Sequence, residues 1–366
     1  MGFTGIANAI GACDNGPWQE VLVIGQHTEG TEYCETKWAD GVVMTGIEVW
    51  GSEFGVLGAQ FYYSDGSNSP QFGKGGGDKH AKLMWDPSVD SISQLKSWGN
   101  GRGQHLGRLQ IRTKKGQELD VGKNTDGQDT FETKVASGIM LGAFGRSTDI
   151  IESMGFLFLK STVDKITIDD IVFDETPEEL NKRMQGIETI VLEYADHTNA
   201  HDAANETYTF GKTEQRATSK KFSSTATHTF GISRNVELSG KILDLGASVS
   251  TSLKYEYSSA KTEESTQERS VTLNYAATTS LKPGQRVFCR ATAFMGTYDG
   301  KYSGNVNVWL ADGYKYGFKV GGTMEQVNWS KASSKCQANE FDPLEDSRNR
   351  PENLNPKGKR AVEFIS

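Results

Sequence analysis

The sequence predicts an all-β protein. Its long windows are rich in Ser, Thr, Gly, Val and Tyr, and apolar residues seldom recur at helical spacing. The chain has 366 residues with 41 glycines and only 8 prolines. The glycines separate short runs of alternating hydrophobicity, as turns separate strands. A chain of this length is expected to form two domains, each large enough for its own core.

Composition limits what the protein can bind. Hydrophobic residues make up 36% and aromatic residues 10% of the chain, which is typical of a folded protein. No stretch approaches the roughly 18 uncharged apolar residues that a spanning helix needs, so membrane contact is expected through β-hairpins or at the surface. The formal charge of −8 argues against a nucleic acid partner and against nonspecific attraction to anionic lipid.

The chain divides into five segments that differ in residue composition and in the length of their predicted strands. After Phe173, Thr176-Pro177-Glu178-Glu179 has the capping residue, proline and acids that begin a helix, which is expected to end near Met184. From Ile187 the strands become long and dominated by Ser and Thr. The predicted segments are an N-terminal extension (1–19), a first β domain (20–174) that closes with strands at 166–168 and 171–173, a linker helix (175–186), a second β domain (187–341) and an extended C-terminal tail (342–366).

Four cysteines, Cys13, Cys34, Cys289 and Cys336, lie two in each half of the chain. None belongs to a CxxC pair, which argues against a metal site or thioredoxin chemistry. Either each domain contains one disulfide or all four are unreactive thiols. The first residues lack the basic segment of a clear signal peptide. We nevertheless expect a secreted protein that acts on target cell membranes.

The residues offer no catalytic constellation. HExxH, GxSxG and Cys/His patterns are absent, and the histidines, such as His27, His80 and His105, are scattered and expected to be exposed. We therefore predict that the protein is not an enzyme and needs no cofactor or metal. Asn205-Glu-Thr207 and Asn328-Trp-Ser330 would be glycosylation sites in a secreted chain.

Several motifs of the first domain, taken in order, resemble the jacalin-related lectins. Trp38-Ala-Asp-Gly41, Thr45-Gly-Ile-Glu-Val-Trp-Gly51 and Gln60-Phe-Tyr-Tyr63 look like the family's opening Greek key, Leu109 to Gly116 like its central hairpin, and Gly142 to Phe156 like its closing motif. The resemblance implies a β-prism I fold for residues 20–174. It also implies carbohydrate binding, with a cell-surface glycan as the partner.

The resemblance places the sugar at two loops. Its implied site residues are Gly25 and Gly30 on one wall, and Thr148, Asp149, Ile150, Ile151 and Glu152 on the other. Exposed backbone N–H groups and the Glu152 carboxylate would bind sugar hydroxyls, each of which donates and accepts. Glu152 stands where the family has aspartate, so the alternative is that Glu152 is merely a solvated loop acid. In the first Greek key Leu57 takes the carboxylate position, and no second site is expected there.

The second domain resembles the aerolysin-like module. The likeness lies in Tyr208-Thr-Phe-Gly211, the Ser/Thr-rich strands near 222–260, and Leu281-Lys-Pro-Gly-Gln-Arg-Val287. It implies an elongated antiparallel β domain that assembles into a homo-oligomeric ring. Each subunit would then insert one β-hairpin into the lipid of the target membrane.

Alternation of apolar and polar residues places this hairpin at about 225–259. Apolar residues occupy even positions in the first arm and odd positions in the second, as a strand with one lipid face requires. The predicted membrane residues are Phe230, Ile232, Val236 and Leu238, then Ile242, Leu243 and Leu245 near the tip, then Val249, Leu253 and Tyr255. One possible register sets Leu238 opposite Leu245 and Phe230 opposite Leu253. A hairpin covering a soluble core would show the same alternation, and Arg234 disagrees with a lipid face.

Together these patterns predict a glycan-targeted, β-barrel pore-forming protein. The alternative is a soluble multivalent lectin without lytic activity. The basic stretch Lys357-Gly-Lys-Arg360 is also expected to be cut by trypsin-like enzymes, which would activate a pore held inactive by its tail.

Overall fold

The protein is described here by a computed structural model covering residues 11–101, 105–175, 187–224, 235–238, 241–244, 247–250, 253–256 and 264–344. The predicted linker helix, apart from its first residue, and residues 345–366 of the tail lie outside these ranges, as do Phe230, Ile232 and Leu245. Within them strands are the dominant structure, and the only helices are the short 3-10 turns η1 (Gly11–Cys13) and η2 (Trp38–Asp40). The predicted all-β class is confirmed. No described helix is long and apolar enough to cross a membrane.

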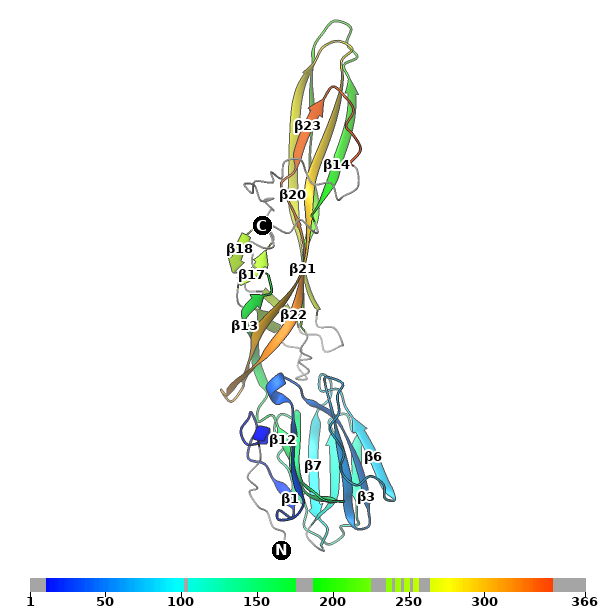
Figure 1. Ribbon diagram of the computed structural model, residues 1–366, viewed down its shortest axis with the longest axis vertical. Coiled ribbons are helices and arrows are strands. Elements are labelled where there is room, and N and C mark those ends of the chain that lie inside the picture. Colours follow the sequence, from blue (N-terminus) through cyan, green and yellow to red (C-terminus); the bar gives the residue numbers. More distant parts are fainter. Residues whose placement is uncertain are drawn as a thin grey trace.

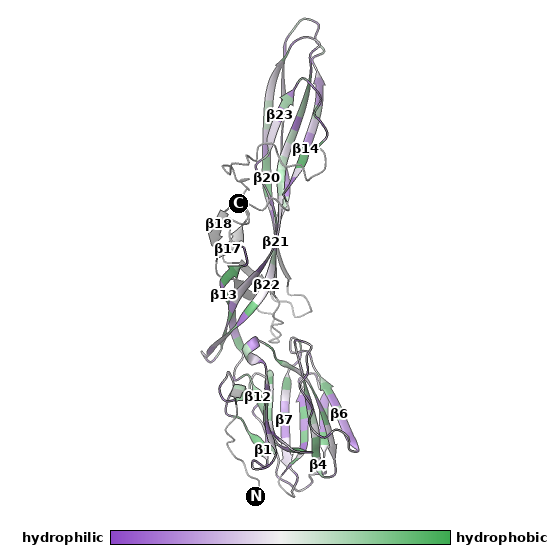
Figure 2. Ribbon diagram, in the orientation of Figure 1, coloured by the Kyte–Doolittle hydropathy of each residue, from purple (hydrophilic) through white to green (hydrophobic). Residues whose placement is uncertain are grey.

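Three four-stranded antiparallel sheets form a β-prism at one end of the molecule (Figure 1). Hydrophilic and hydrophobic residues alternate along these strands (Figure 2), so each sheet turns its apolar side chains inward. The interior contains fully buried Ile47, Phe61 and Leu95. The sheets are β1 (Val23–Gly25), β12 (Ile151–Phe158), β11 (Met140–Ser147) and β2 (Thr31–Thr36); β10 (Phe131–Glu132), β7 (Ile92–Gly99), β8 (Leu106–Thr113) and β9 (Glu118–Gly122); and β5 (Phe72–Gly73), β4 (Gly55–Tyr63), β3 (Met44–Ser52) and β6 (Lys79–Met84).

A nine-stranded sheet extends away from the prism and gives the molecule its elongated shape (Figure 1). β21 spans 25 residues and β15 spans 19, several times the usual five or six. The predicted elongated β domain is therefore confirmed. The sheet consists of β13 (Val163–Phe173), β14 (Ile187–Thr198), β15 (Glu206–Ser224), β16 (Asn235–Leu238), β19 (Leu253–Glu256), β20 (Glu264–Leu281), β21 (Arg286–Leu310), β22 (Lys315–Trp329) and β23 (Ser333–Gln337), with β17 (Lys241–Asp244) and β18 (Ala247–Ser250) as a separate pair.

The assignment of residues 163–173 to the prism is wrong. β13 pairs antiparallel with β21, from Val163 opposite Leu310 to Phe173 opposite Tyr302, and so belongs to the elongated sheet. The alternation of Ile166 and Ile168 predicted a strand correctly. The strand with which it pairs lies about 140 residues later in the chain, and the local sequence pattern does not indicate which strand that is. The prism strands end with β12, and the first domain is shorter than predicted.

Each half of the chain contains one disulfide. Cys13 is joined to Cys34 in the prism, and Cys289 is joined to Cys336 between β21 and β23. Of the two alternatives for the cysteines, one disulfide per domain is confirmed. The first bond ties the predicted N-terminal extension to β2, because Cys34 lies in that strand. Cys13 itself is buried.

Candidate functional site

The two predicted walls of the sugar site lie side by side. β1 pairs with β12, which sets Gly25 opposite Ser153, and Gln26 N donates to Glu152 O at 3.0 Å. Gly25 and Gly30 have φ of +121° and +83°, and a Cβ on either would lie within 2.7 Å of the neighbouring backbone. Only glycine allows this close approach. The structure thus brings together the loops that the sequence assigned to one site.

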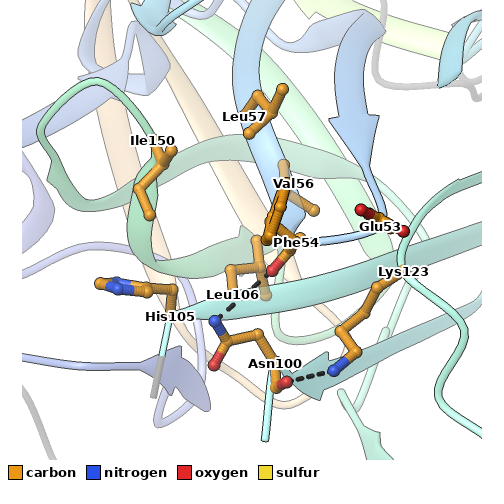
Figure 3. A pocket seen from close by; sticks show the side chains of 10 residues that line it. Glu53, Phe54, Val56, Leu57, Asn100, His105, Leu106, Lys123 and Ile150 are labelled. Carbon is orange, nitrogen blue, oxygen red and sulfur yellow. Dashed lines mark hydrogen bonds between the residues drawn. The ribbon is translucent and has the colours of Figure 1, made fainter. Parts of the chain in front are cut away.

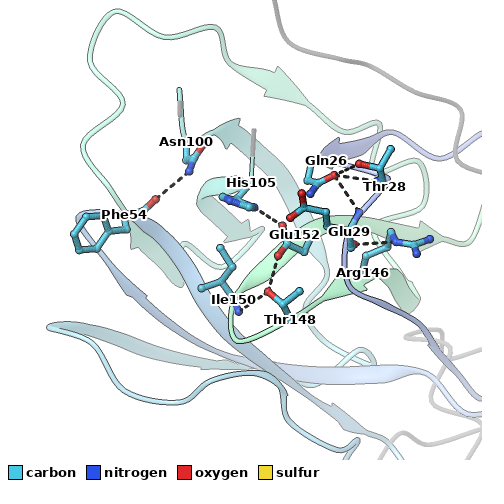
Figure 4. Close-up of polar contacts among 10 residues, drawn as sticks. All are labelled: Gln26, Thr28, Glu29, Phe54, Asn100, His105, Arg146, Thr148, Ile150 and Glu152. Carbon is cyan, nitrogen blue, oxygen red and sulfur yellow. Dashed lines mark hydrogen bonds and ion pairs between the residues drawn. The ribbon is translucent and has the colours of Figure 1, made fainter. Parts of the chain in front are cut away.

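Internal hydrogen bonds hold the 25–30 loop in shape (Figure 4). Gln26 Oε1 accepts from Thr28 N at 2.9 Å, from Thr28 Oγ1 at 2.7 Å and from Glu29 N at 3.2 Å. From the other side Arg146 donates to Glu29 O at 3.0 Å and to Gly30 O at 2.9 Å. The first wall is therefore fixed before any ligand arrives.

His27 lies on this wall and is half-buried, not exposed as predicted. Burial, followed by the nearby Arg146 charge, lowers the pKa of its ring below 6.5. Its Nε2 has no hydrogen-bond partner in the described part of the chain.

Glu152 is not a solvated loop acid. It lies in β12 and is only 2% exposed. Thr148 Oγ1 donates to Glu152 Oε1 at 2.5 Å, and His105 Nδ1 contacts Glu152 Oε2 (Figure 4). His105, predicted to be exposed, has a ring that is only 23% exposed. Both carboxylate oxygens are thus engaged within the protein, and a sugar hydroxyl would have to displace one of these partners to reach them.

The backbone N–H groups of the second wall differ in whether they are free to bind a ligand. Thr148 N donates to Ile150 O at 2.9 Å, and Ile150 N contacts Thr148 Oγ1 at 3.4 Å. Ile151 is fully buried in β12, which removes it from the predicted surface. The Asp149 N–H makes no hydrogen bond with any described residue, while Asp149 O accepts from Lys74 N at 2.9 Å. Of the three predicted amides, that of Asp149 is the one free to meet a ligand.

A concave pocket of about 490 Å³ adjoins this wall (Figure 3). Ile150 and His105 line it from the predicted site, so the two are contiguous. The rest of its lining comes from the β3–β4 turn, the loop after β7 and the end of β9, and consists of Glu53, Phe54, Gly55, Val56, Leu57, Asn100, Leu106 and Lys123. Of these residues the sequence analysis had named only Leu57, as the residue at a position where no second site was expected. The described residues contain no group of three or more His, Cys, Asp or Glu side chains placed to hold a metal ion.

The predicted membrane hairpin has two short ladders in one common register. Asn235 to Leu238 pair with Glu256 to Leu253, and Lys241 to Asp244 pair with Ser250 to Ala247. The proposed register is wrong by eight residues, since Leu238 lies opposite Leu253 and not Leu245. Alternation fixes which residues share a face but leaves the register open to even shifts. The innermost described pair, Asp244 opposite Ala247, lies close in sequence to the predicted tip.

Comparison with known proteins supports both halves of this description. Residues 23–157 match a family model described as a Jacalin-like lectin domain. The solved structure of a lamprey immune protein has a TM-score of 0.68 at 18% identity, and the match covers 88% of this chain and 99% of that one. At this identity the likeness shows the fold alone.

Lectins match the prism only. A Malaysian banana lectin is 16% identical, and a mannose-binding jacalin-related lectin from Ananas comosus is 20% identical. Each match covers 37% of this chain and 94% of the lectin, with a TM-score of 0.31. Comparison with curated protein sequences gives no match. The chain thus contains a jacalin-like lectin domain joined to an additional elongated β region.

The two predicted glycosylation triplets differ in access. Asn205 is exposed in the loop between β14 and β15, whereas Asn328 is 5% exposed within β22. A buried strand residue cannot be modified in the folded protein, so only the first triplet is available.

Proposed function

We propose that this chain is a secreted, glycan-targeted pore-forming protein. Its prism would bind carbohydrate on a cell surface, several copies would assemble into a ring, and each copy would insert one hairpin into the target membrane. The jacalin-like domain supports the targeting step. The two disulfides are consistent with an oxidising, extracytoplasmic compartment.

The observation that carries the pore is the hairpin between β15 and β20. Its two described ladders share one register and fall within the sequence ranges 235–244 and 247–256, each ten positions long. A tilted membrane strand needs about 9–11 residues. Alternation along the paired arms puts Val236 with Tyr255, Leu238 with Leu253 and Ile242 with Val249 on one face of the ladder.

The opposite face carries the polar pair Glu237 and Lys254, although Leu243 with Ser248 also falls on it and Asp244 falls on the apolar face. One apolar and one polar face is what a barrel wall between lipid and water requires. Arg234, which disagreed with a lipid face, lies outside the described residues.

The chain connections also support insertion. β15 and β20 pair without interruption from Glu206 opposite Leu281 to Ser223 opposite Glu264. In sequence the hairpin lies between these two strands, and its β16 is paired in parallel with β13 at three described positions, 236–238 with 166–168. Releasing these three pairs would free the hairpin to extend the long ladder.

Extension requires one adjustment of register. Asn235 comes twelve positions after Ser223, whereas Glu264 comes eight positions after Glu256. A straight ladder must absorb this difference of four by slippage or a bulge. Because the difference is even, the apolar and polar faces are preserved.

Dye release from liposomes tests the proposal. Liposomes displaying the best hit of a glycan array should bind the protein and leak, while liposomes without that glycan should do neither. Electron microscopy of the leaking liposomes should show rings. Binding without leakage over a wide concentration range would instead support a soluble multivalent lectin.

A disulfide lock tests the hairpin directly. Thr167 and Glu237 are Cα partners in the parallel ladder, and neighbouring strands lie about 4.8 Å apart, within reach of a disulfide. The pair Thr167→Cys and Glu237→Cys should bind glycan but release no dye until a reductant is added. Each single variant is the matched control. A locked protein that leaks as fast as the single variants would contradict release of β16.

A further inference from the structure

The outer face of the β15–β20 ladder is uncharged over twelve positions. They are alternate residues from Thr207 to Ala217 on β15 and from Ser270 to Ser280 on β20, and all of them are exposed. They consist of Thr, Ser, Asn, Gln, Ala and Gly only. Because 23% of the chain is charged and charged residues concentrate at the surface, several charges would normally occur among so many exposed positions. We call this surface the hydroxyl face.

We propose that the hydroxyl face lines the channel outside the membrane, and that Glu264 and Glu268, next to the hairpin, form an acidic collar that makes the channel prefer cations. This inference rests on the proposed pore-forming function and names the class of solute that the pore would conduct best.

The layering of the elongated region determines which side of the ladder can face a channel. The inward side chains Phe210 and Tyr275 share a core with Cys289 and Ala291 of β21, at the end of the molecule away from the prism (Figure 1). Behind the two strands of the ladder lie three, since β21 pairs there with both β14 and β23. In a ring the wider layer takes the longer outer circumference, because each strand needs about 4.8 Å. The hydroxyl face then points to the centre.

The ladder has free edges along which neighbouring copies could join. Within the described ranges β20 pairs only with β15, and residues 206–218 of β15 have no second strand beside them. Ladders that pair edge to edge close into a barrel and leave no edge exposed. The six pairs that join 219–224 to β22 would have to open for the barrel to reach the hairpin.

The side chains of the hydroxyl face suit a wet channel wall. Thr213 Oγ1 donates to Asn274 Oδ1 at 2.8 Å across the ladder, and the hydroxyls of Thr209 and Thr278 lie 3.4 Å apart. Each hydroxyl can also bind water, so the wall stays hydrated without a fixed charge. Such a stretch conducts ions of either sign, and selectivity must come from another part of the same face.

Alternation connects the hydroxyl face with the polar face of the hairpin. Odd positions of β15 and even positions of β20 lie on the hydroxyl face. The polar pair Glu237 and Lys254 has the same parity in the two arms of the hairpin. The spacings between ladder and hairpin are even, so extension keeps both on one side. One channel would therefore run along both.

Charge returns where the ladder approaches the hairpin. Glu268 lies on the same side as the hydroxyl face and is exposed, and the register places Glu264 there as well. Lys221 is the lysine on this side, and it forms an ion pair with Glu325 at 3.7 Å. If the opening of β22 frees Lys221, two acids still face one lysine on each copy.

The described part of the hairpin does not offset this charge. Two acids, Glu237 and Glu256, and two lysines, Lys241 and Lys254, fall on its polar side and balance. The collar therefore sets the sign of the field in the channel. A ring of carboxylates favours cations, and salt screens it over about 8 Å at 0.15 M.

Reversal potentials in a KCl gradient test the collar. Bilayers bearing the best glycan should show wild-type channels that prefer K⁺ over Cl⁻ several-fold. Glu264→Gln with Glu268→Gln should bring this ratio close to one, and the two lysine substitutions should favour Cl⁻. The matched control is Asp196→Asn with Glu340→Gln, which removes two exposed charges from β14 and from the segment after β23. It should keep the wild-type ratio.

A cysteine scan tests the hydroxyl face. A cationic thiol reagent added to open channels should reduce the current of Thr209→Cys and leave that of Thr198→Cys unchanged, because Thr198 is exposed at the end of β14 in the other layer. All variants should bind the glycan-bearing bilayer as wild type does.

A wild-type preference for Cl⁻, an unchanged ratio in the Gln variant, or equal effects of the reagent on both cysteines would overturn the assignment. If the wild-type protein binds but opens no channel, the proposed function is wrong and the collar falls with it.

Discussion

Replacing Glu152 with alanine should destabilise the prism as well as alter the site. The carboxylate is 2% exposed, and its removal leaves Thr148 and His105 without their partner. Orphaning buried polar groups costs about 1–3 kcal/mol. His105 is 23% exposed and keeps some access to water, so the penalty stays below that of breaking a fully buried ion pair. About 2 kcal/mol is the expected loss.

Calorimetry of unfolding measures this loss. For a domain of the size of the prism, 2 kcal/mol lowers the melting temperature by about 4–8 °C. Glu152→Gln is the matched variant, because its side-chain oxygen can still accept from Thr148, and it should lose less. A double-mutant cycle with His105→Ala should give a coupling above roughly 0.5 kcal/mol.

A solvated Glu152 would behave differently. In that case Glu152→Ala would melt as the wild-type protein does, and the cycle with His105→Ala would show no coupling. If Glu152→Ala lost glycan binding without losing stability, the Glu152 carboxylate would be a direct sugar ligand. Loss of both would fit the arrangement described here, in which Glu152 positions the 148–152 loop from beneath.

Two further predictions concern the hairpin and the junction between the modules. Environment-sensitive dyes on single cysteines should report lipid at Val249 and water at Ser250 in leak-competent protein, because adjacent strand positions face opposite sides; water at both would exclude this hairpin as the barrel wall. Gly41→Ala should lower stability by about 1–3 kcal/mol, since a Cβ there would lie 2.4 Å from the Phe318 ring. Gly66→Ala, where φ is +80° but space is open, is the control for backbone strain alone, and an equal melting temperature in both would refute the packing argument.

The sequence was informative wherever structure follows from local pattern. Alternation and glycine spacing predicted strands, and the ordered motifs between Trp38 and Gly155 predicted the prism. The approach of Gly25 and Gly30 to the 148–152 loop was also expected, but only because the resemblance to jacalin-related lectins implied it.

Pairing over long distances could not be predicted in the same way. His105 contacts a carboxylate 47 residues away, and no periodicity links the two positions. The same limitation placed β13 in the wrong sheet.

If the proposed function holds, the junction between prism and elongated sheet limits the ways in which glycan binding could lead to insertion. One continuous core includes Val43 and Leu157 of the prism, Ile168 of β13 and Phe318 of β22. The ring of Trp38 lies 5.9 Å from that of Tyr316 across this junction. A shared apolar core does not act as a hinge, because rotating one module would expose it to water. Glycan binding would therefore act by concentrating and orienting the elongated sheets on the surface, and contacts between neighbouring copies would have to release the hairpin from β13.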